Sequence, residues 1–518
     1  NGDITVNTVS GNTWTRGTGT LVLANTTTLP STIFSSFNNL TINSGATVTS
    51  GVSFSVAGTM TVNGSFIPGA TGHVISGAGT LTGSGSIDVN LVSTTALTTQ
   101  YTITTRTLTN LTVDYSAAGN QSLASSTYGA LTTSGSGTKT LLGGTTINNA
   151  VTIGLGTTLN ASIFTHAIKG NWVNNGTFTP STSTIQFTGT SAQHILGSVA
   201  TTFNNFTVNN SSGVTLSGTV DATVNGTLTL TSGLVTPNTN YFTLGSAGTI
   251  SGASSSSYIN GLFSRVITGT SAVSFPIGKG GNYRPVTFTY ASAPGTKTVK
   301  IEQFETGSPL SISTASTILF GSRYWSVDQS ETGVSYTIGL NNSGNSPTGT
   351  VVMLRREGTG STTQNATSFS TPTYTNSSSF STTNISNDVM LAETSIPLTV
   401  TGATTANKVY DGTNTATVTG GALVGIVGSD EVTLTQSGTF AQTGVGTGIA
   451  ITSTSTIGGA NAANYSLTQP SLTARNITAK ALTVTGATTA NKVYDGTNTA
   501  TVTGGTLVGI VGSDVVTL

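Results

Sequence analysis

Short runs in which apolar residues alternate with threonine or serine recur along most of this chain. Examples are Val52–Val56, Met60–Val62 and Leu228–Thr231. Alternation with period two puts every second side chain on one face of an extended strand. Glycine, Asn-Gly and Ser-Gly separate the runs, as turns require, and so much glycine disfavours helices. The pattern predicts an all-β protein.

Charge excludes several classes of partner. Charged residues are 6% of the chain, and 16 Lys and Arg balance 16 Asp and Glu. No basic face is therefore available to neutralise phosphates, so nucleic acid and anionic membranes are not expected partners. There is no cysteine, so disulfides do not hold this chain together. No apolar run is long enough for a transmembrane helix.

The uneven distribution of charge suggests the domain boundaries. Residues 1–257 contain eight charged residues, whereas the shorter segment 258–395 contains fifteen. Beyond them, Leu398–Leu434 returns as Leu482–Leu518 with two substitutions, Ala422 to Thr506 and Glu431 to Val515. We therefore expect four regions, which are 1–257, 258–397, a complete module at 398–481 and the start of a second, truncated module at 482–518. The sequence thus predicts a piece of a longer tandem protein.

The first region contains a loose sequence repeat, since Phe37–Asn43 and Phe203–Asn209 have similar sequences. Short strands, frequent turns and loose repetition favour a parallel β-solenoid. Tandem β-sandwiches are the alternative for residues 1–257. Residues 258–397 have longer strand-like runs and are expected to form an antiparallel β-sandwich, followed by tandem β-rich modules.

No set of residues predicts catalysis, a cofactor or a metal. His73, His166 and His194 lack metal-ligand spacing. Calcium is a minor alternative at Asp411, Asp430 and Asp495, which lack EF-hand spacing. T-x-T patterns are typical of ice-binding solenoids, but in this sequence they do not recur at a fixed spacing, so ice binding is not predicted. Asp88, Asp114 and Asp221 are too scattered for a hydrolase. The candidate ligand contacts are Tyr283, Arg284 and Trp325, in the second region.

The repeated module resembles a known family. The residues that carry the resemblance are Asn407–Val409, Tyr410–Thr413, Gly420–Gly421, Leu423–Gly425 and Ala462–Leu467. Together they resemble the YDG domain, which recurs in bacterial surface adhesins of the filamentous-haemagglutinin type and in secreted Bacteroidota proteins. A second group of segments looks like a stretch common in giant Bacteroidota surface proteins exported by type IX secretion: Tyr258–Gly261, Phe275–Lys279, Tyr283–Val286 and Gly321–Trp325.

The resemblance implies an extracellular protein of the bacterial cell surface that acts in cell adhesion, including adhesion in gliding or biofilm, with no catalytic residues. We therefore expect a stalk-like, non-enzymatic adhesin segment. Its partners would be surface glycans or host and neighbour-cell surfaces, the outer-membrane secretion machinery during export, and other copies of itself if it self-associates. A carbohydrate-binding or carbohydrate-active protein with its site in residues 258–397 is the alternative. A self-assembling matrix or sheath protein is a third class.

Overall fold

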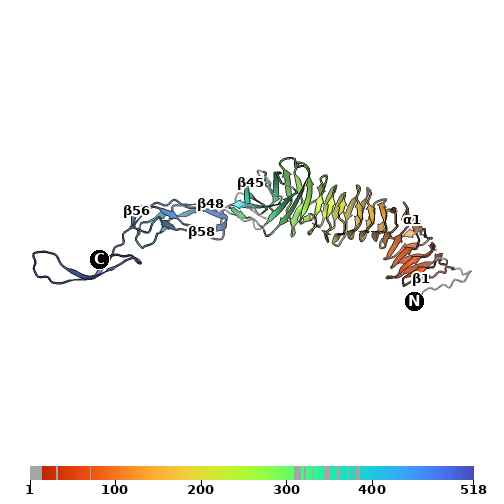
Figure 1. Cartoon of the computed structure of the whole chain (residues 1–518), viewed down its shortest axis with the longest axis horizontal. Coiled ribbons are helices and arrows are strands. Elements are labelled where there is room, and N and C mark those ends of the chain that lie inside the picture. Colours follow the sequence, from red (N-terminus) through yellow and green to blue (C-terminus); the bar gives the residue numbers. More distant parts are fainter. Residues whose placement is uncertain are drawn as a thin grey trace. The chain divides into compact units, whose positions relative to one another are not determined.

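A computed structural model gives the fold of the chain (Figure 1). It describes residues 14–518 except 31–32, 71, 308–316, 320–322, 331, 344–350, 359–361, 371–372, 377–378 and 381–385. The chain forms two compact units. The first comprises Asn1–Ser311, Gly321–Asn345 and Met353–Leu391, and the second comprises Ile312–Phe320, Ser346–Val352 and Ala392–Leu518.

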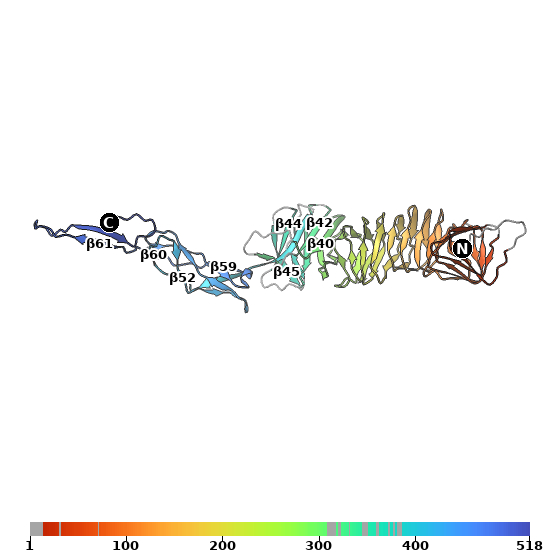
Figure 2. The ribbon, with the colours of Figure 1, turned by 90° about the horizontal axis from the view of Figure 1, so that it is seen from below.

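The first unit begins with a parallel β-solenoid, visible in Figures 1 and 2 as a stack of short strands. One 14-stranded sheet runs along its full length. Its strands, in order, are β2 (Thr27–Leu29), β5 (Thr47–Ser50), β8 (Ser65–Pro68), β11 (Ser86–Val89), β13 (Thr112–Tyr115), β16 (Ala130–Thr133), β19 (Val151–Ile153), β22 (Trp172–Asn174), β25 (Gln193–Gly197), β28 (Val214–Leu216), β31 (Val235–Thr236), β34 (Ile259–Asn260), β37 (Ile277–Lys279) and β38 (Asn282–Tyr283). All neighbours are parallel except the hairpin of β37 with β38. The prediction of a parallel solenoid is therefore confirmed.

Two other faces complete each turn. In the first half they are a five-stranded sheet of β1 (Thr20–Leu23), β4 (Asn39–Ile42), β7 (Thr59–Val62), β10 (Thr80–Thr82) and β12 (Thr105–Arg106), and a three-stranded sheet of β3 (Ser36–Phe37), β6 (Phe54–Val56) and β9 (Ile75–Ser76). In the second half they are β14 (Gln121–Leu123), β17 (Gly137–Leu141), β20 (Thr157–Asn160) and β23 (Thr177–Thr179) on one face, and on the other β15 (Thr127–Tyr128), β18 (Thr145–Ile147), β21 (Thr165–Ile168), β24 (Thr184–Phe187), β27 (Asn205–Asn209), β30 (Thr227–Ser232) and β33 (Thr249–Ser251).

Alternation along each strand produces the solenoid core. In β7, Met60 and Val62 point inward and are fully buried, while Thr59 and Thr61 alternate with them and face outward. Because the strands pair in parallel and in register, apolar residues of adjacent turns lie side by side, as Leu40 and Met60 do. Aromatic rings also contact each other between adjacent turns, and the Phe187 and Phe206 centroids are 5.1 Å apart. Burial of these rows supplies the main stabilising term.

A short helix lies where the two halves of the solenoid meet. It is α1 (Ala96–Gln100), and its Ala96, Leu97 and Gln100 are buried. The Gln100 amide hydrogen-bonds to the Asn90 side chain and accepts from the Asn90 N–H. The helix is an insertion that lengthens this turn, because Tyr101, directly after it, still forms a parallel bridge with Ile75 of β9. Within the described residues, no helix is long and apolar enough to cross a membrane.

Antiparallel strands end the first unit. They continue the face formed by β26 (Thr201–Phe203), β29 (Ala222–Val224) and β32 (Phe242–Leu244), because β35 (Phe263–Ile267) pairs in parallel with β32 and antiparallel with β40 (Lys297–Phe304). The other strands of this sheet are β36 (Val273–Phe275), β39 (Val286–Tyr290), β42 (Tyr324–Gln329), β43 (Tyr336–Asn341), β44 (Val351–Glu357), β45 (Thr362–Ser370), β46 (Thr373–Asn376) and β47 (Ser386–Thr394), with β41 (Thr317–Leu319) beside β47. The solenoid thus passes directly into an antiparallel sheet, and β34 and β37 lie beyond residue 257.

The second unit contains the repeated module. Its strands are β48 (Ile396–Thr401), β49 (Thr404–Thr405), β50 (Lys408–Val409), β51 (Thr415–Ala416), β52 (Val418–Thr419), β53 (Ala422–Val424), β54 (Thr433–Thr435), β55 (Gly438–Phe440), β56 (Gly446–Ile449), β57 (Ile451–Ser453), β58 (Thr456–Gly458), β59 (Tyr465–Thr468) and β60 (Arg475–Thr478), with a 3₁₀ turn at Ala462–Asn464. A small core joins them, made of Ala416, Phe440, Ile449, Ile451 and Ile477. A hairpin of β61 (Thr483–Thr489) and β62 (Val502–Val508) follows.

Candidate functional sites

The three candidate ligand contacts occupy different environments. Trp325 is 1% exposed, because its side chain lies on the buried face of strand β42 in the antiparallel sheet. Tyr283 is partly exposed, and its ring lies 5.4 Å from that of Tyr258. Arg284 is buried, but its guanidinium hydrogen-bonds to the Ser343 hydroxyl at 2.6 Å and to Asn282. Of the three, Tyr283 presents the most surface to a ligand.

Arg284 belongs to a cluster in which two arginines share one glutamate. Its Nε lies 3.3 Å from Oε1 of Glu305, and Nε of Arg323 lies 2.9 Å from Oε2 of the same carboxylate. Burial lowers the pKa of Arg284, as does the charge of Arg323, and Glu305 opposes both. The cluster links the residues directly after β38, directly after β40 and directly before β42, and it is a structural cross-link. Gly321 and Ser322, which precede it in the sequence motif, lie outside the described residues.

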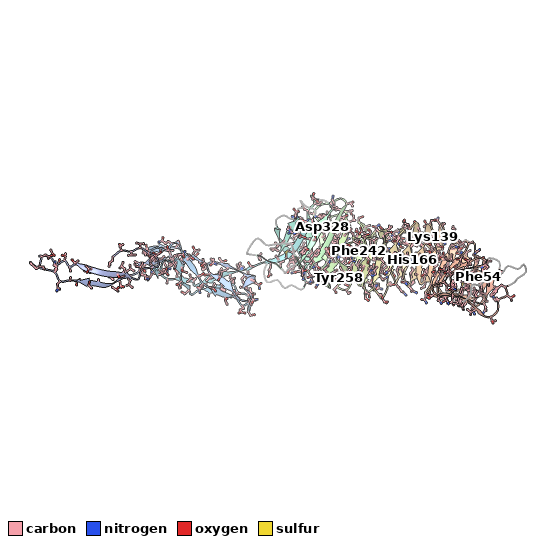
Figure 3. The ribbon with its side chains drawn as sticks, turned by 60° about the horizontal axis from the view of Figure 1, so that its bottom comes forward. Phe54, Lys139, His166, Phe242, Tyr258 and Asp328 are labelled. Carbon is pink, nitrogen blue, oxygen red and sulfur yellow. The ribbon has the colours of Figure 1, made fainter. Side chains whose placement is uncertain are left out.

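The three histidines lie apart. His166 is in the solenoid core, visible with Lys139 and Phe242 in Figure 3, whereas His73 contacts Ser50 and His194 contacts the Ser217 hydroxyl. Among the described residues, no three His, Cys, Asp or Glu side chains are grouped so that they could hold a metal ion.

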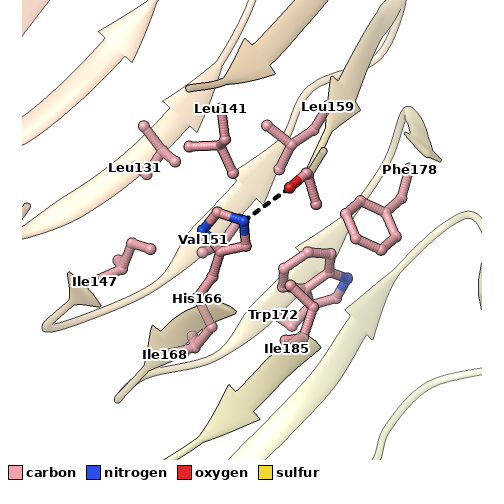
Figure 4. Close-up of a pocket in the computed structure, with 11 residues that line it drawn as sticks. Leu131, Leu141, Ile147, Val151, Leu159, His166, Ile168, Trp172, Phe178 and Ile185 are labelled. Carbon is pink, nitrogen blue, oxygen red and sulfur yellow. Dashed lines mark hydrogen bonds between the residues drawn. The ribbon is translucent and has the colours of Figure 1, made fainter. Parts of the chain in front are cut away.

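His166 lines a small apolar cavity of about 10 Å³ (Figure 4). Its Nε2 donates to the Ala161 carbonyl oxygen at 2.9 Å, while Nδ1 is buried with no partner among the described residues. The surrounding side chains are apolar, and Trp172 and Phe178 are among them. Burial lowers the pKa of His166, so the ring is neutral near pH 7.

Asp88 and Asp114, which looked too scattered in the sequence, occupy the same position on adjacent turns of the solenoid. They are in-register partners of β11 and β13. Burial raises the pKa of Asp88 to about 6, and the charge of Asp114 adds to the rise. The Ser134 hydroxyl donates to Oδ2 of Asp114 at 2.7 Å. The 26-residue spacing hides this pair, because α1 lengthens the turn between them. Asp221 lies elsewhere and accepts the Tyr241 N–H.

Lys139 is a fully buried charge in the same part of the solenoid. Its Nζ donates to the carbonyl oxygens of Ala117 and Gly119, at 2.7 and 3.0 Å, and to Oε1 of Gln121 at 2.6 Å. Burial lowers its pKa to about 8. Ala117 and Gly119 lie between β13 and β14, and Gln121 is the first residue of β14. We interpret Lys139 as a structural residue that satisfies these oxygens.

The repeated Tyr-Asp-Gly-Thr turn is held by side chains of its own copy. Oδ1 of Asp411 accepts from the backbone N–H of Thr413 at 2.9 Å, and Lys408 Nζ lies 2.7 Å from the same oxygen. The Lys408 hydrogen bond is the main cause that lowers the pKa of Asp411 to about 2. Gly412 has φ +79°, as a tight turn requires. The same contacts recur at Lys492, Asp495 and Thr497.

One comparison with known proteins gives a match, and it covers the repeated module. The fold defines an all-β protein that combines a parallel solenoid with small repeated β-modules. Residues 393–473 and 478–518 match the model of the YDG domain, once for each copy of the repeat. The chain therefore contains YDG-domain sequence in residues 393–473 and 478–518. Searches of the curated proteins and of the solved structures give no significant match.

Proposed function

We propose that the chain is a non-catalytic structural and adhesive segment of a large, repetitive protein of the bacterial cell surface. The observation that carries the proposal is the 14-stranded sheet, whose backbone ladder runs without interruption from β2 to β38. A ladder of this kind resists extension because every turn is hydrogen-bonded to the next. The repeated YDG modules add further length.

The outer surface of the solenoid supports the same proposal. Its outward positions are mostly threonine, serine and asparagine, and charged residues are 6% of the chain. The contacts of a surface with so few charges depend little on salt concentration. It suits contacts with hydroxyl-rich surfaces such as glycans, which hydrogen-bond through neutral groups.

Attachment under flow tests the proposal. Beads that carry the whole chain should attach to glycan-coated or cell-coated surfaces more strongly than beads that carry an unrelated all-β protein of similar charge. Antibodies against the chain should also label intact cells of the source bacterium. Attachment no better than that of the control beads, together with labelling only after cell lysis, would rule the proposal out.

A further inference from the structure

The solenoid turn that contains α1 is longer than the turn that follows it. Asp88, Asp114 and Thr132 are in-register partners on three successive turns, so the first interval is 26 residues and the second is 18. In repeat architectures, insertions into a repeat become loops on one face, and that face is often the one that binds a ligand. The insertion therefore directs the search for a binding site to the surface around α1.

The loop that leads into α1 is fixed against the neighbouring sheet. Oε1 of Gln100 accepts the backbone N–H groups of Asn90 and Leu91 at 2.9 and 3.3 Å. The carbonyl oxygen of Ser93 accepts the N–H of Ser122 at 3.0 Å, as a neighbouring strand would. The loop thus lies beside β14, which is the edge strand of the sheet β14–β17–β20–β23.

A groove of about 280 Å³ lies where this loop meets β14 and β17. Its lining is polar and uncharged, because each of its side chains ends in a hydroxyl or an amide. The main lining residues are Ser93, Asn120, Gln121, Ser122, Thr138 and Thr140. Within the described residues, no aromatic, aliphatic or ionised side chain lines the groove. Its chemistry therefore suits neither a lipid nor a phosphate.

The floor of the groove is set before any ligand arrives. Gln121 is 2% exposed, and its Oε1 accepts from the Ala117 N–H at 3.2 Å and from Nζ of Lys139 at 2.6 Å. Its Nε2 donates to the carbonyl oxygens of Val89 and Leu91 at 2.7 and 3.0 Å. A site that is already ordered loses less conformational entropy when it binds.

The walls offer hydroxyls that the protein itself does not use. Among the described residues, the hydroxyls of Ser122, Thr138 and Thr140 have no hydrogen-bond partner. Strand pairing places Thr140 beside Ser122, and Asn160 and Thr179 extend this row over the next two turns. Adjacent turns are about 4.8 Å apart, and each hydroxyl can both donate and accept. The row can therefore bond to successive hydroxyls of one extended ligand.

We infer that the groove beside α1 binds an uncharged glycan chain, which lies across β14 and β17 along the row that Ser122 and Thr140 begin. Sugar hydroxyls both donate and accept, as the lining hydroxyls do, so each contact can form in either direction. The side chain of Lys139 lies below the floor, where its three oxygen acceptors enclose it. We thereby give a location to the glycan contacts of the proposed function, on which the inference rests.

An array of neutral and acidic oligosaccharides, probed with the whole chain, tests the chemistry of the groove. We expect binding to neutral oligosaccharides of hexoses or N-acetylhexosamines, and no gain from added sulfate or carboxylate groups. Calorimetry with a neutral oligosaccharide bound on the array should give one site per chain. Absence of binding to every neutral oligosaccharide, or binding that requires an acidic group, would overturn the inference.

Matched substitutions test the location. Ser122→Ala combined with Thr140→Val should weaken binding of the neutral oligosaccharide about tenfold, because two sugar hydroxyls lose their partners. The Tm should not change, since both side chains face outward. Thr152→Val is the control, because Thr152 also faces outward but lies on the 14-stranded sheet. Equal binding by the two variants would overturn the inference. If the double variant still attached fully to glycan-coated surfaces under flow, the proposed function would stand and this site would not.

Discussion

Asp88 lies directly opposite Asp114 on the neighbouring turn of the solenoid, so two carboxylates share one partly buried strip of the 14-stranded sheet. Two like charges at this spacing oppose each other's ionisation. The pair therefore destabilises the folded state when both carboxylates are ionised, although the backbone pairing of the solenoid holds them together.

The aspartate pair should make the solenoid more stable in mild acid. The folded-state pKa of Asp88 is raised to about 6 from 3.8, so the folded protein binds more protons between these values than the unfolded chain. The loss of stability that the raised pKa causes is absent below pH 3.8 and complete above about pH 6. Asp88→Asn should therefore raise the Tm at pH 7.5, and the gain should shrink at pH 4.5. Calorimetry at both pH values measures it. Asp221→Asn is the control, and a gain independent of pH would contradict the prediction.

His166 should act in the opposite direction. Burial lowers its folded-state pKa below 6.5, so the unfolded chain takes up a proton first as the pH falls. Stability should drop below pH 6.5 on account of this residue. His166→Leu removes the titrating group from an apolar cavity, so its Tm should fall less between pH 7 and pH 5 than that of the unaltered chain. Scanning calorimetry at both pH values checks this. The same substitution at His194, which is only partly buried, serves as the comparison.

The repeat provides its own control for the Tyr-Asp-Gly-Thr turn. Asp411→Ala removes the acceptor for the Thr413 N–H and the partner of Lys408, so it should lower the Tm of the module. Asp495→Ala removes the same contacts in residues 482–518, which add nothing to the core around Phe440. It should leave that transition unchanged. Scanning calorimetry of both variants gives the answer, and equal shifts would show that the turn acts independently of the core.

Glycan binding, if the antiparallel sheet provides it, should depend on Tyr283. Its ring is partly exposed beside Tyr258, so Tyr283→Ala should reduce binding on a glycan array without unfolding the chain. Trp325→Ala creates a cavity in the core and should cost about 3–5 kcal/mol of stability, whatever its effect on binding. An array signal unchanged by Tyr283→Ala would remove this residue as a ligand contact.

The solenoid could be predicted from sequence because its information is local. Alternation in Met60–Val62 defines the buried face, and glycine defines the turns. The Asp88–Asp114 pair could not be predicted in the same way, since its register depends on how many residues α1 adds to one turn. The acceptors of Lys139 could not be predicted for a related reason, because two of the three are backbone oxygens, 22 and 20 residues away in the sequence. Burial of Trp325 was equally hidden, because an aromatic residue on a strand fits either face.

The two kinds of architecture imply different orders of assembly as the chain emerges from the ribosome. Each solenoid turn closes on its predecessor over a separation such as the 20 residues between Asn39 and Thr59, so folding can follow synthesis turn by turn. In the module, the carbonyl oxygen of Thr405 can accept its hydrogen bond only after Arg475, 70 residues later, has been synthesised. Loop closure over that distance comes late. A nascent chain therefore holds a finished solenoid while the first half of each module is still an unstructured segment open to other strands.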